Sequence, residues 1–376
     1  MEPAKRKRVT RVGSGAFSIY LPKKWIDGWL PEQQERREVE LRFISQSLLV
    51  TPAILDKTYR ATVPVDQGSV CMRLLSAYVR GNHRVALAPP DGKRFDNDCV
   101  TAARDFLRHL DERLVAHAAG DSIGFSLDPG LPPPASTGDD MLHVLGAKVR
   151  EVLALAADAV RMYGHDPDRT LHALHLLRTI HHEDVERLFH QILRMVTSLE
   201  IPMRSVSEYQ FLGLAAAEMH QISGNALKMA RTILEAYGLT PEDLGFPRAH
   251  LLGRMERPPP VQGVALELVR GYREPFERTQ ALHQQLLDAF QARDIAALMA
   301  LVDEAPRVQD RLQERTFQVV AEQWGRSIEP EDALAAHTAS KIASPLANIL
   351  DSMRMIAHHA VALLAAEKEG DGPEAP

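Results

Sequence analysis

The sequence has little cysteine and no long hydrophobic run. Its 376 residues include only two cysteines, Cys71 and Cys99, and these do not form a CxxC motif. A disulfide framework is therefore excluded, and we expect both thiols to be packing residues of a cytoplasmic protein. No run of eighteen apolar residues occurs, and the basic N-terminus is not followed by the apolar stretch of a signal peptide. We therefore expect no membrane insertion.

The sequence also lacks the common signatures of catalysis. It contains no glycine-rich phosphate loop, no GxSxG motif, no paired zinc motif and no recognisable pair of acid and base carboxylates. We therefore expect no enzymatic activity, with a metal-dependent hydrolase around His182 as a minor alternative.

What is present is an ordinary globular composition with an uneven distribution of charge. Hydrophobic residues make up 45% of the chain and charged residues 25%, which is enough to build more than one core. The net charge is -6, but residues 1–52 hold ten Lys and Arg against six Asp and Glu, a net charge of +4. This leaves -10 for the other 324 residues, so a basic N-terminal region precedes an acidic body.

Residues 1–53 alternate short β-branched and aromatic segments with turns. The predicted strands are Val9–Val12, Phe17–Leu21, Val39–Ile44 and Ser47–Val50, which pair as two hairpins. Pro22 suits the first turn of a short helix at Lys23–Ile26 between the hairpins. Because so small a β unit buries little by itself, we expect it to form a homodimer.

Residues 54–128 alternate strand and helix patterns and predict a small α/β domain of order βαβαββ. The expected strands are Thr58–Val63, His83–Leu87, Leu114–Ala119 and Ile123–Leu127, and the expected helices are Ser69–Arg80 and Asp98–His109. Residues 129–138 follow as a proline-rich linker.

From residue 139 onward, apolar residues recur at helical spacing. Residues 139–238 and 264–368 each predict an antiparallel three-helix bundle, and a proline-rich connector over 239–263 separates them. Similar residues recur 124 positions apart, as in Leu171 and Ile295, which indicates two diverged repeats. Residues 369–376 are expected to be a disordered tail. The expected fold class is thus multidomain and mainly α.

The N-terminal block resembles a known class of DNA-binding domain. Residues 8–25 (RVTRVGSGAFSIYLPKKW), with the later strand Leu48–Pro52, are similar to the AbrB/MazE/SpoVT swapped-hairpin family. This resemblance implies a dimeric domain that binds double-stranded DNA.

The helical region resembles a second family. Its two repeats are similar to the PhoU family, in which each repeat forms a three-helix bundle. The combination of these modules with an α/β insert resembles the phosphate-uptake regulators common in archaea. The resemblance implies a body that senses a phosphate-related signal or binds phosphate-transport or sensor-kinase proteins.

The chain departs from the PhoU pattern at the metal-binding carboxylates. The acidic pair of the first repeat becomes His182 and Glu186, and the later run reads His220–Gly224. In the second repeat the corresponding residues are Pro306 with Asp310, and Ser340 to Ser344. A multinuclear iron or manganese cluster is therefore not expected.

A different metal site remains open in the first repeat. On a helix, His182, Glu186 and His190 fall on one face at i, i+4 and i+8, where they could bind a divalent transition metal with His220 as a further ligand. A solvated helix face is the alternative interpretation. The neighbouring His181 lies on the apolar seam and is interpreted as a packed core residue.

The candidate DNA-binding residues are the cations of the N-terminal block. They are Lys5, Arg6, Lys7, Arg8, Arg11, Lys23 and Lys24. Cations of this kind neutralise phosphates and release counterions. The sequence therefore favours a cytoplasmic, DNA-binding transcriptional regulator linked to phosphate uptake or phosphate signalling. The alternative is a PhoU-like adaptor that regulates a phosphate transporter or sensor kinase, with the N-terminal block used for dimerisation.

Overall fold

The computed structural model describes nine segments of the chain. These are residues 10–12, 16–18, 39–44, 47–52, 58–128, 138–198, 206–240, 272–323 and 330–370. They fall into two compact units, Met1–Lys57 and Thr58–Pro376. Within the described residues the protein is mostly helical, with one small four-stranded mixed sheet.

The first unit contains two antiparallel strand pairs. β1 (Thr10–Val12) pairs with β2 (Ala16–Ser18), and β3 (Val39–Ile44) pairs with β4 (Ser47–Pro52). The two pairs stand where the sequence predicts hairpins, although the first is shorter than expected. The predicted helix at Lys23–Ile26 lies outside the described residues.

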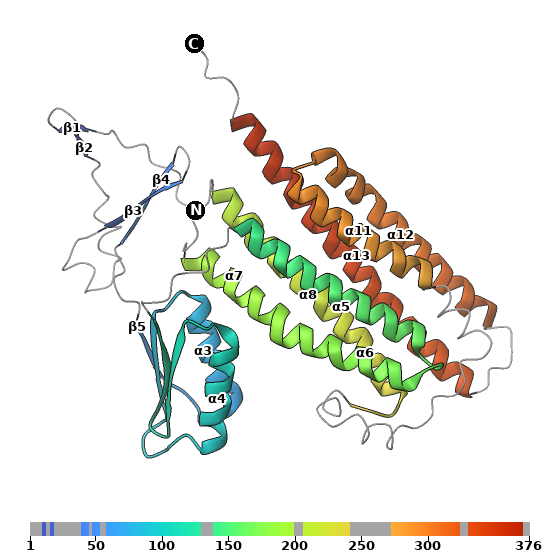
Figure 1. The fold of residues 1–376 in the computed structure, drawn as a ribbon, viewed down its shortest axis with the longest axis horizontal. Coiled ribbons are helices and arrows are strands. Elements are labelled where there is room, and N and C mark those ends of the chain that lie inside the picture. Colours follow the sequence, from blue (N-terminus) through green and yellow to red (C-terminus); the bar gives the residue numbers. More distant parts are fainter. Residues whose placement is uncertain are drawn as a thin grey trace, which may run out of the picture. The chain divides into compact units, whose positions relative to one another are not determined.

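The second unit begins with an α/β block in the predicted βαβαββ order. Its elements are β5 (Thr58–Thr62), α3 (Gln67–Val79), β6 (Arg84–Ala88), α4 (Asn97–Leu110), β7 (Leu114–Ala119) and β8 (Ser122–Leu127). The sheet order is β5-β6-β8-β7, with β5 parallel to β6 and the other pairs antiparallel. The two helices cover one face of the sheet (Figure 1).

Both helices of the α/β block begin at an aspartate cap. The Asp66 carboxylate accepts a hydrogen bond from the Ser69 amide, and Asp96 accepts one from the Cys99 amide. Cys99 is buried in the core of this block, as expected for a packing residue. At Gly124 a side chain is excluded, because an added Cβ would lie 1.9 Å from the Val85 carbonyl oxygen on the neighbouring strand.

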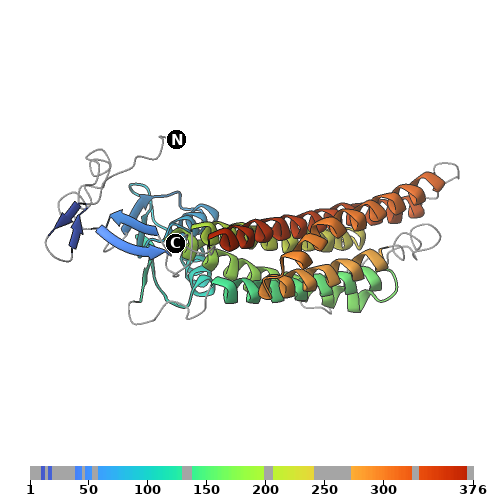
Figure 2. The same ribbon diagram turned by 90° about the horizontal axis from the view of Figure 1, so that it is seen from above.

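The rest of the second unit is a body of long helices. Its elements are α5 (Gly138–Met162), α6 (Pro167–Ile180), the π-helical segment η1 (His181–Val185), α7 (Glu186–Ser198), α8 (Val206–Ala236), α11 (Arg273–Gln291), α12 (Ile295–Gln323) and α13 (Pro330–Gly370). The segments α6, η1 and α7 follow one another without a break. All these helices run along a common direction (Figure 2).

The helices of the two predicted repeats share one hydrophobic core. The core runs from Met141 on α5 to Leu364 on α13 and includes residues of both predicted repeats. The pairs α8–α13 and α5–α11 join one repeat to the other. The apolar seams of the two repeats therefore face each other, which buries more apolar area than two isolated three-helix units would.

The helices also differ from the sequence expectation in length. α13 continues to Gly370, beyond Lys368 where the second bundle was expected to end. The residues Glu367 to Glu369 are good helix formers, so the helix propagates through them. Residues 371–376 lie outside the described residues, as do 241–271 of the connector region.

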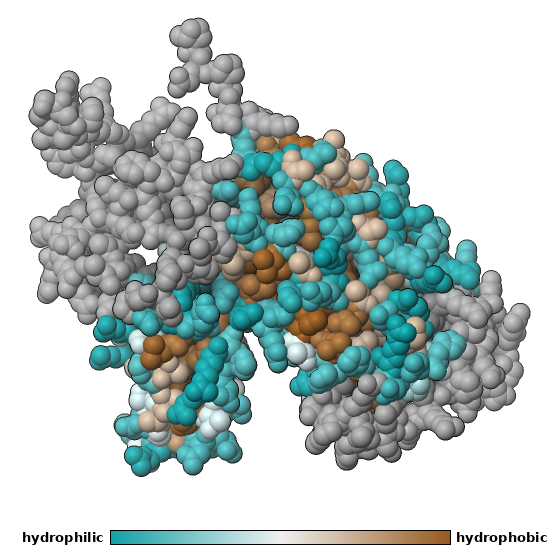
Figure 3. Space-filling model, in the orientation of Figure 1, coloured by the Kyte–Doolittle hydropathy of each residue, from teal (hydrophilic) through white to brown (hydrophobic). Residues whose placement is uncertain are grey.

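α13 is the one described helix that is long and apolar enough to cross a membrane by composition alone. The window is Ser340–Glu367, with a mean hydropathy of 1.2, and half of it is buried inside the body. Core helices of soluble proteins share these properties, so the finding is weak evidence for a membrane span. Among the coloured atoms of Figure 3, teal hydrophilic residues alternate with brown hydrophobic patches.

Candidate metal centre

The candidate site lies at the π-helical segment η1, between α6 and α7. The amide of Glu186 donates to the carbonyl of His181, five residues earlier, which is the hydrogen bond of a π turn. Turns of this kind insert one extra residue into an α-helix and are frequent at functional sites.

Three donor side chains converge at this turn. Glu186 Oε1 lies 3.5 Å from His181 Nε2 and 3.2 Å from His182 Nδ1. The donor atoms of His181, His182 and Glu186 all lie within 4.8 Å of one another. Two imidazoles and one carboxylate form a donor set that suits zinc and other divalent transition metals.

Ser223 on α8 fixes the ring of His181. Its hydroxyl oxygen lies 2.7 Å from His181 Nδ1, and both residues are buried. Which atom donates depends on the protonation of the ring: the Ser223 hydroxyl donates to a bare Nδ1 and accepts from Nδ1–H. When Nε2 binds an ion, Nδ1–H donates to the same hydroxyl, which is the usual support of a metal-ligating histidine.

An aromatic stack supports the His181 ring from the side. His220 stacks on His181 with ring centroids 5.7 Å apart, and Phe189 stacks on His220 at 4.4 Å. Burial lowers the pKa of His220 to about 4, and a charge on His181 acts in the same direction. His220 is therefore neutral near pH 7 and adds no positive charge that would repel a metal ion.

The carboxyl of Glu186 is held in its ionised form. Burial raises its pKa, but hydrogen bonds and charge from His181 and His182 outweigh burial, so the pKa lies well below its usual range. An ionised carboxylate is the form that binds a cation.

A further contact anchors the π segment to α5. The Lys148 ammonium lies 3.2 Å from Asp184 Oδ2, and Arg187 lies 3.2 Å from Asp184 Oδ1. Asp184 is thus neutralised by two cations and does not join the donor set. Together with the Ser223 contact, this ion pair fixes the segment to α5 and α8.

The structure brings together two of the four ligands expected from the sequence. His182 and Glu186 meet as the i, i+4 spacing predicts. His190 and His220 lie close enough to interact by charge with the group but do not belong to the donor set. Burial lowers the pKa of His190. The centroids of the His190 and Phe189 rings lie 5.3 Å apart.

His181 is the member of this candidate donor set that the sequence interpretation assigned to the core. It is buried on the seam, as expected for a core residue, but the π turn also directs its ring to Glu186. The apolar spacing Leu177, His181, Val185 fits an α-helix equally well, so the residue pattern contains no signal for the π turn.

The donor set fits one ion better than a cluster. Among the described residues the group contains a single carboxylate, Glu186, so it offers no second carboxylate to bridge two ions. The two imidazoles would instead hold a single ion beside Glu186, which leaves coordination positions for water or a further ligand.

Of the candidate DNA-binding residues, only Arg11 lies within the described residues. It stands in β1, opposite Phe17 of β2. Lys5, Arg6, Lys7, Arg8, Lys23 and Lys24 lie outside the described residues.

Comparison with known proteins adds no relative to these observations. No protein-family model matches the chain, and no curated protein matches it significantly.

Proposed function

We propose that this protein is a DNA-binding transcriptional regulator with an ion-responsive helical body. Residues 1–53 bind double-stranded DNA as a homodimer, and the body carries the sensory site at His181, His182 and Glu186. The protein acts by binding rather than by catalysis.

The distribution of charge is the observation that carries the DNA-binding proposal. The cations of residues 1–52 give this region a net charge of +4, whereas the other 324 residues carry -10. A basic region on an acidic chain attracts polyanions to one place and repels them elsewhere. Two antiparallel strand pairs in a separate compact unit support this interpretation, because the family resemblance rests on such hairpins.

The signal proposed for the body is a divalent transition metal. The convergence of two imidazoles and an ionised carboxylate supports it, as does the buried hydroxyl of Ser223 behind His181. The link to phosphate uptake or signalling rests on the resemblance of the two helical repeats to the PhoU family.

DNA binding is tested by its dependence on salt. Binding of the full chain to promoter DNA from its own genome is measured over a series of salt concentrations, with Arg8→Ala and Arg11→Ala as variants. Each lost phosphate contact should flatten the slope of log K against log salt by about 0.9. Thermal stability should change little, because the proposal gives both cations a role in DNA contact and none in folding.

The matched controls are Arg150→Ala and Arg161→Ala on α5 in the acidic body, which should leave DNA affinity unaltered. Equal losses from both sets would indicate diffuse charge attraction, and a loss from the body variants alone would overturn the assignment of residues 1–53. If no promoter fragment binds even at low salt, the alternative function is favoured. In that case the protein is an adaptor that regulates a phosphate transporter or sensor kinase by protein contact.

A further inference from the structure

We propose that an ion bound at His181, His182 and Glu186 holds α7 in the register that docks the α/β block, so that this block is the output of the site. The inference rests on the ion site of the proposed function and is independent of DNA binding by residues 1–53.

The first step is the geometry of the π turn. In an α-helix, residues five apart are separated by about 140° around the axis and point in different directions. The π turn closes this angle, so that His181 Nε2 and Glu186 Oε1 approach to 3.5 Å. An ion that binds both side chains therefore binds the π form and not the straight α-helical form. By linkage, it stabilises the π turn.

The second step is the continuity of α7 with this turn. Glu186 is the first residue of α7, and the helix runs from there to Ser198 without interruption. Loss of the π turn would remove one residue from the turn and rotate α7 by about 100° and shift it by about 1.5 Å relative to α6. The side chains of α7 would then point in other directions.

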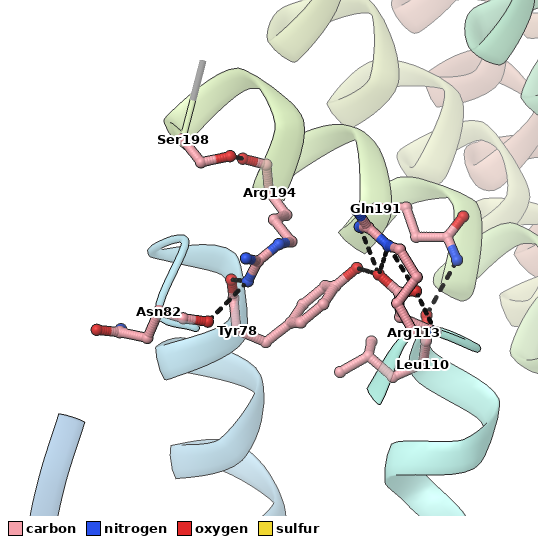
Figure 4. Close-up of polar contacts among 8 residues, drawn as sticks. Tyr78, Asn82, Leu110, Arg113, Gln191, Arg194 and Ser198 are labelled. Atoms are coloured by element: carbon pink, nitrogen blue, oxygen red, sulfur yellow. Dashed lines mark hydrogen bonds and ion pairs between the residues drawn. The ribbon is translucent and has the colours of Figure 1, made fainter. Parts of the chain in front are cut away.

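The third step is the contact of α7 with α3. Arg194 is fully buried, and its Nη1 donates to the carbonyl oxygens of Tyr78 at 2.8 Å and Asn82 at 3.1 Å. Its guanidinium lies 4.8 Å from the centre of the Tyr78 ring. Thr197 donates to the carbonyl of Val79. The helix dipole favours a cation at the carbonyl end of α3. The two hydrogen bonds also require the guanidinium of Arg194 to point at this end (Figure 4).

The fourth step is the contact of α7 with α4. Gln191 donates to the carbonyl of Leu110, the last residue of α4, at 3.1 Å. Next to it, the Tyr78 hydroxyl donates to Asp111, which pairs with Arg113 at 2.7 Å. α7 thus contacts the carbonyl ends of both helices of the α/β block, and a buried network joins these ends (Figure 4).

These contacts are directional, so they tolerate a change of register poorly. A rotation of α7 would withdraw the guanidinium of Arg194 from two carbonyls and leave buried polar groups unsatisfied. Ion binding at one end of α7 and docking of the α/β block at its other end therefore favour the same state of one helix. Two sites that bias one equilibrium are coupled, and the coupling is reciprocal.

The coupling is tested by hydrogen exchange on the full chain with and without Zn²⁺. We expect Zn²⁺ to slow exchange severalfold in peptides that cover residues 76–82 at the end of α3. In Arg194→Lys, which keeps the charge but loses the planar fork, this slowing should disappear while Zn²⁺ still binds. Because coupling is reciprocal, the variant should also bind Zn²⁺ about fivefold more weakly or worse.

Two matched controls accompany the variants. Arg354→Lys on α13 alters an arginine whose ion pair in the described part of the chain is with Asp351 of the same helix, and it should leave both measurements unchanged. If Arg194→Lys fails to fold, Thr197→Val on α7 replaces it as a milder change, and it should reduce the effect of Zn²⁺ on exchange at residues 76–82. Its control is Thr232→Val, because Thr232 bonds to the Lys228 carbonyl of its own helix.

The exchange and binding measurements with Zn²⁺ distinguish the coupling from the ion site. Binding of Zn²⁺ without a change at residues 76–82 would overturn the coupling and leave the ion site standing. A response in the Arg194→Lys and Thr197→Val variants equal to that of the unaltered chain would also overturn it. No binding of Zn²⁺ would overturn the ion site and the coupling together, whereas failure to bind DNA would affect neither.

Discussion

His181 and His182 are adjacent in the chain but occupy different environments. His181 is 4% exposed and contacts Ser223, whereas 44% of the His182 side chain is exposed. One ligand is therefore fixed in the interior, and the other stands at the surface beside Glu186. An ion bound here would meet solvent on the side of His182 and a fixed ring on the side of His181.

The first prediction concerns the stoichiometry and ligands of the site. Calorimetric titration should show one Zn²⁺ per chain, and elemental analysis should find less than one tightly held iron or manganese per chain. His181→Ala, His182→Ala and Glu186→Gln should each weaken Zn²⁺ binding strongly, and Ser223→Ala by about tenfold, since supporting residues typically contribute 10–100-fold.

The control for this titration is His172→Ala, which removes an exposed histidine of α6 and should leave Zn²⁺ affinity unchanged. Several iron or manganese ions per chain would show that other residues replace the missing carboxylates.

Another histidine, His283 on α11, lies in the core. It is fully buried, and neither ring nitrogen has a hydrogen-bond partner within the part of the chain that the structure describes. An unsatisfied buried polar group costs about 1–3 kcal/mol. We predict that His283→Leu raises the free energy of unfolding by about that amount, as measured by urea denaturation at pH 7. The exposed variant His358→Leu should change it little.

The same histidine predicts a dependence of stability on pH. Burial lowers the pKa of His283 to about 4, with the charge of Arg150 acting in the same direction. Between pH 6.5 and pH 4 the unfolded state binds a proton that the folded state does not, so stability falls as the pH decreases. This loss, of about 1.4 kcal/mol per pH unit, should be smaller in His283→Leu. An unchanged pH profile in the variant would contradict the assignment.

At the scale of elements, α5 and α11 pack unusually closely at one point. A Cβ added at Gly146 on α5 would lie 2.4 Å from a methyl carbon of Leu287 on α11, and Leu287 is buried. Alanine is favoured over glycine in a helix by about 1 kcal/mol, but overpacking a core costs about 1–3 kcal/mol. We predict that Gly146→Ala lowers the free energy of unfolding by up to about 2 kcal/mol, measured by chemical denaturation.

A double variant tests this packing argument. In the background Leu287→Ala the contact is absent, so Gly146→Ala should become neutral or stabilising through helix propensity alone. Additive effects of the two changes would show that the two helices do not meet at Gly146. Because α5 and α11 belong to different predicted repeats, the same measurement tests the shared core.

At the scale of the whole molecule, the second compact unit begins at Thr58. The strand pairs of the first unit are too small to bury a sizeable core alone, so we predict that residues 8–52 form the dimer contact. Removal of residues 1–53 should lower the mass measured by light scattering while leaving the helical circular dichroism signal of the body intact. A shortened chain that assembles just as the full chain does would place the dimer contact elsewhere.

The sequence by itself determined most of the elements of the described residues. Alternation with period two marked the strands of the α/β block, and apolar spacing of three and four marked the helices from residue 139 onward. These patterns depend on local geometry, because the backbone dictates which side chains share a face. The same reasoning placed His182 and Glu186 together, since i and i+4 meet on any helix.

Only the tertiary structure decided what the elements pack against. The joining of two predicted bundles in one core, the π turn at His181 and the contact of Arg194 with the carbonyl end of α3 all depend on partners far away along the chain. Periodicity states that a face is apolar but not which face covers it. A π turn is chosen by the contacts that fix it, here Ser223 on α8 and Lys148 on α5, and these exist only after the helices have packed together.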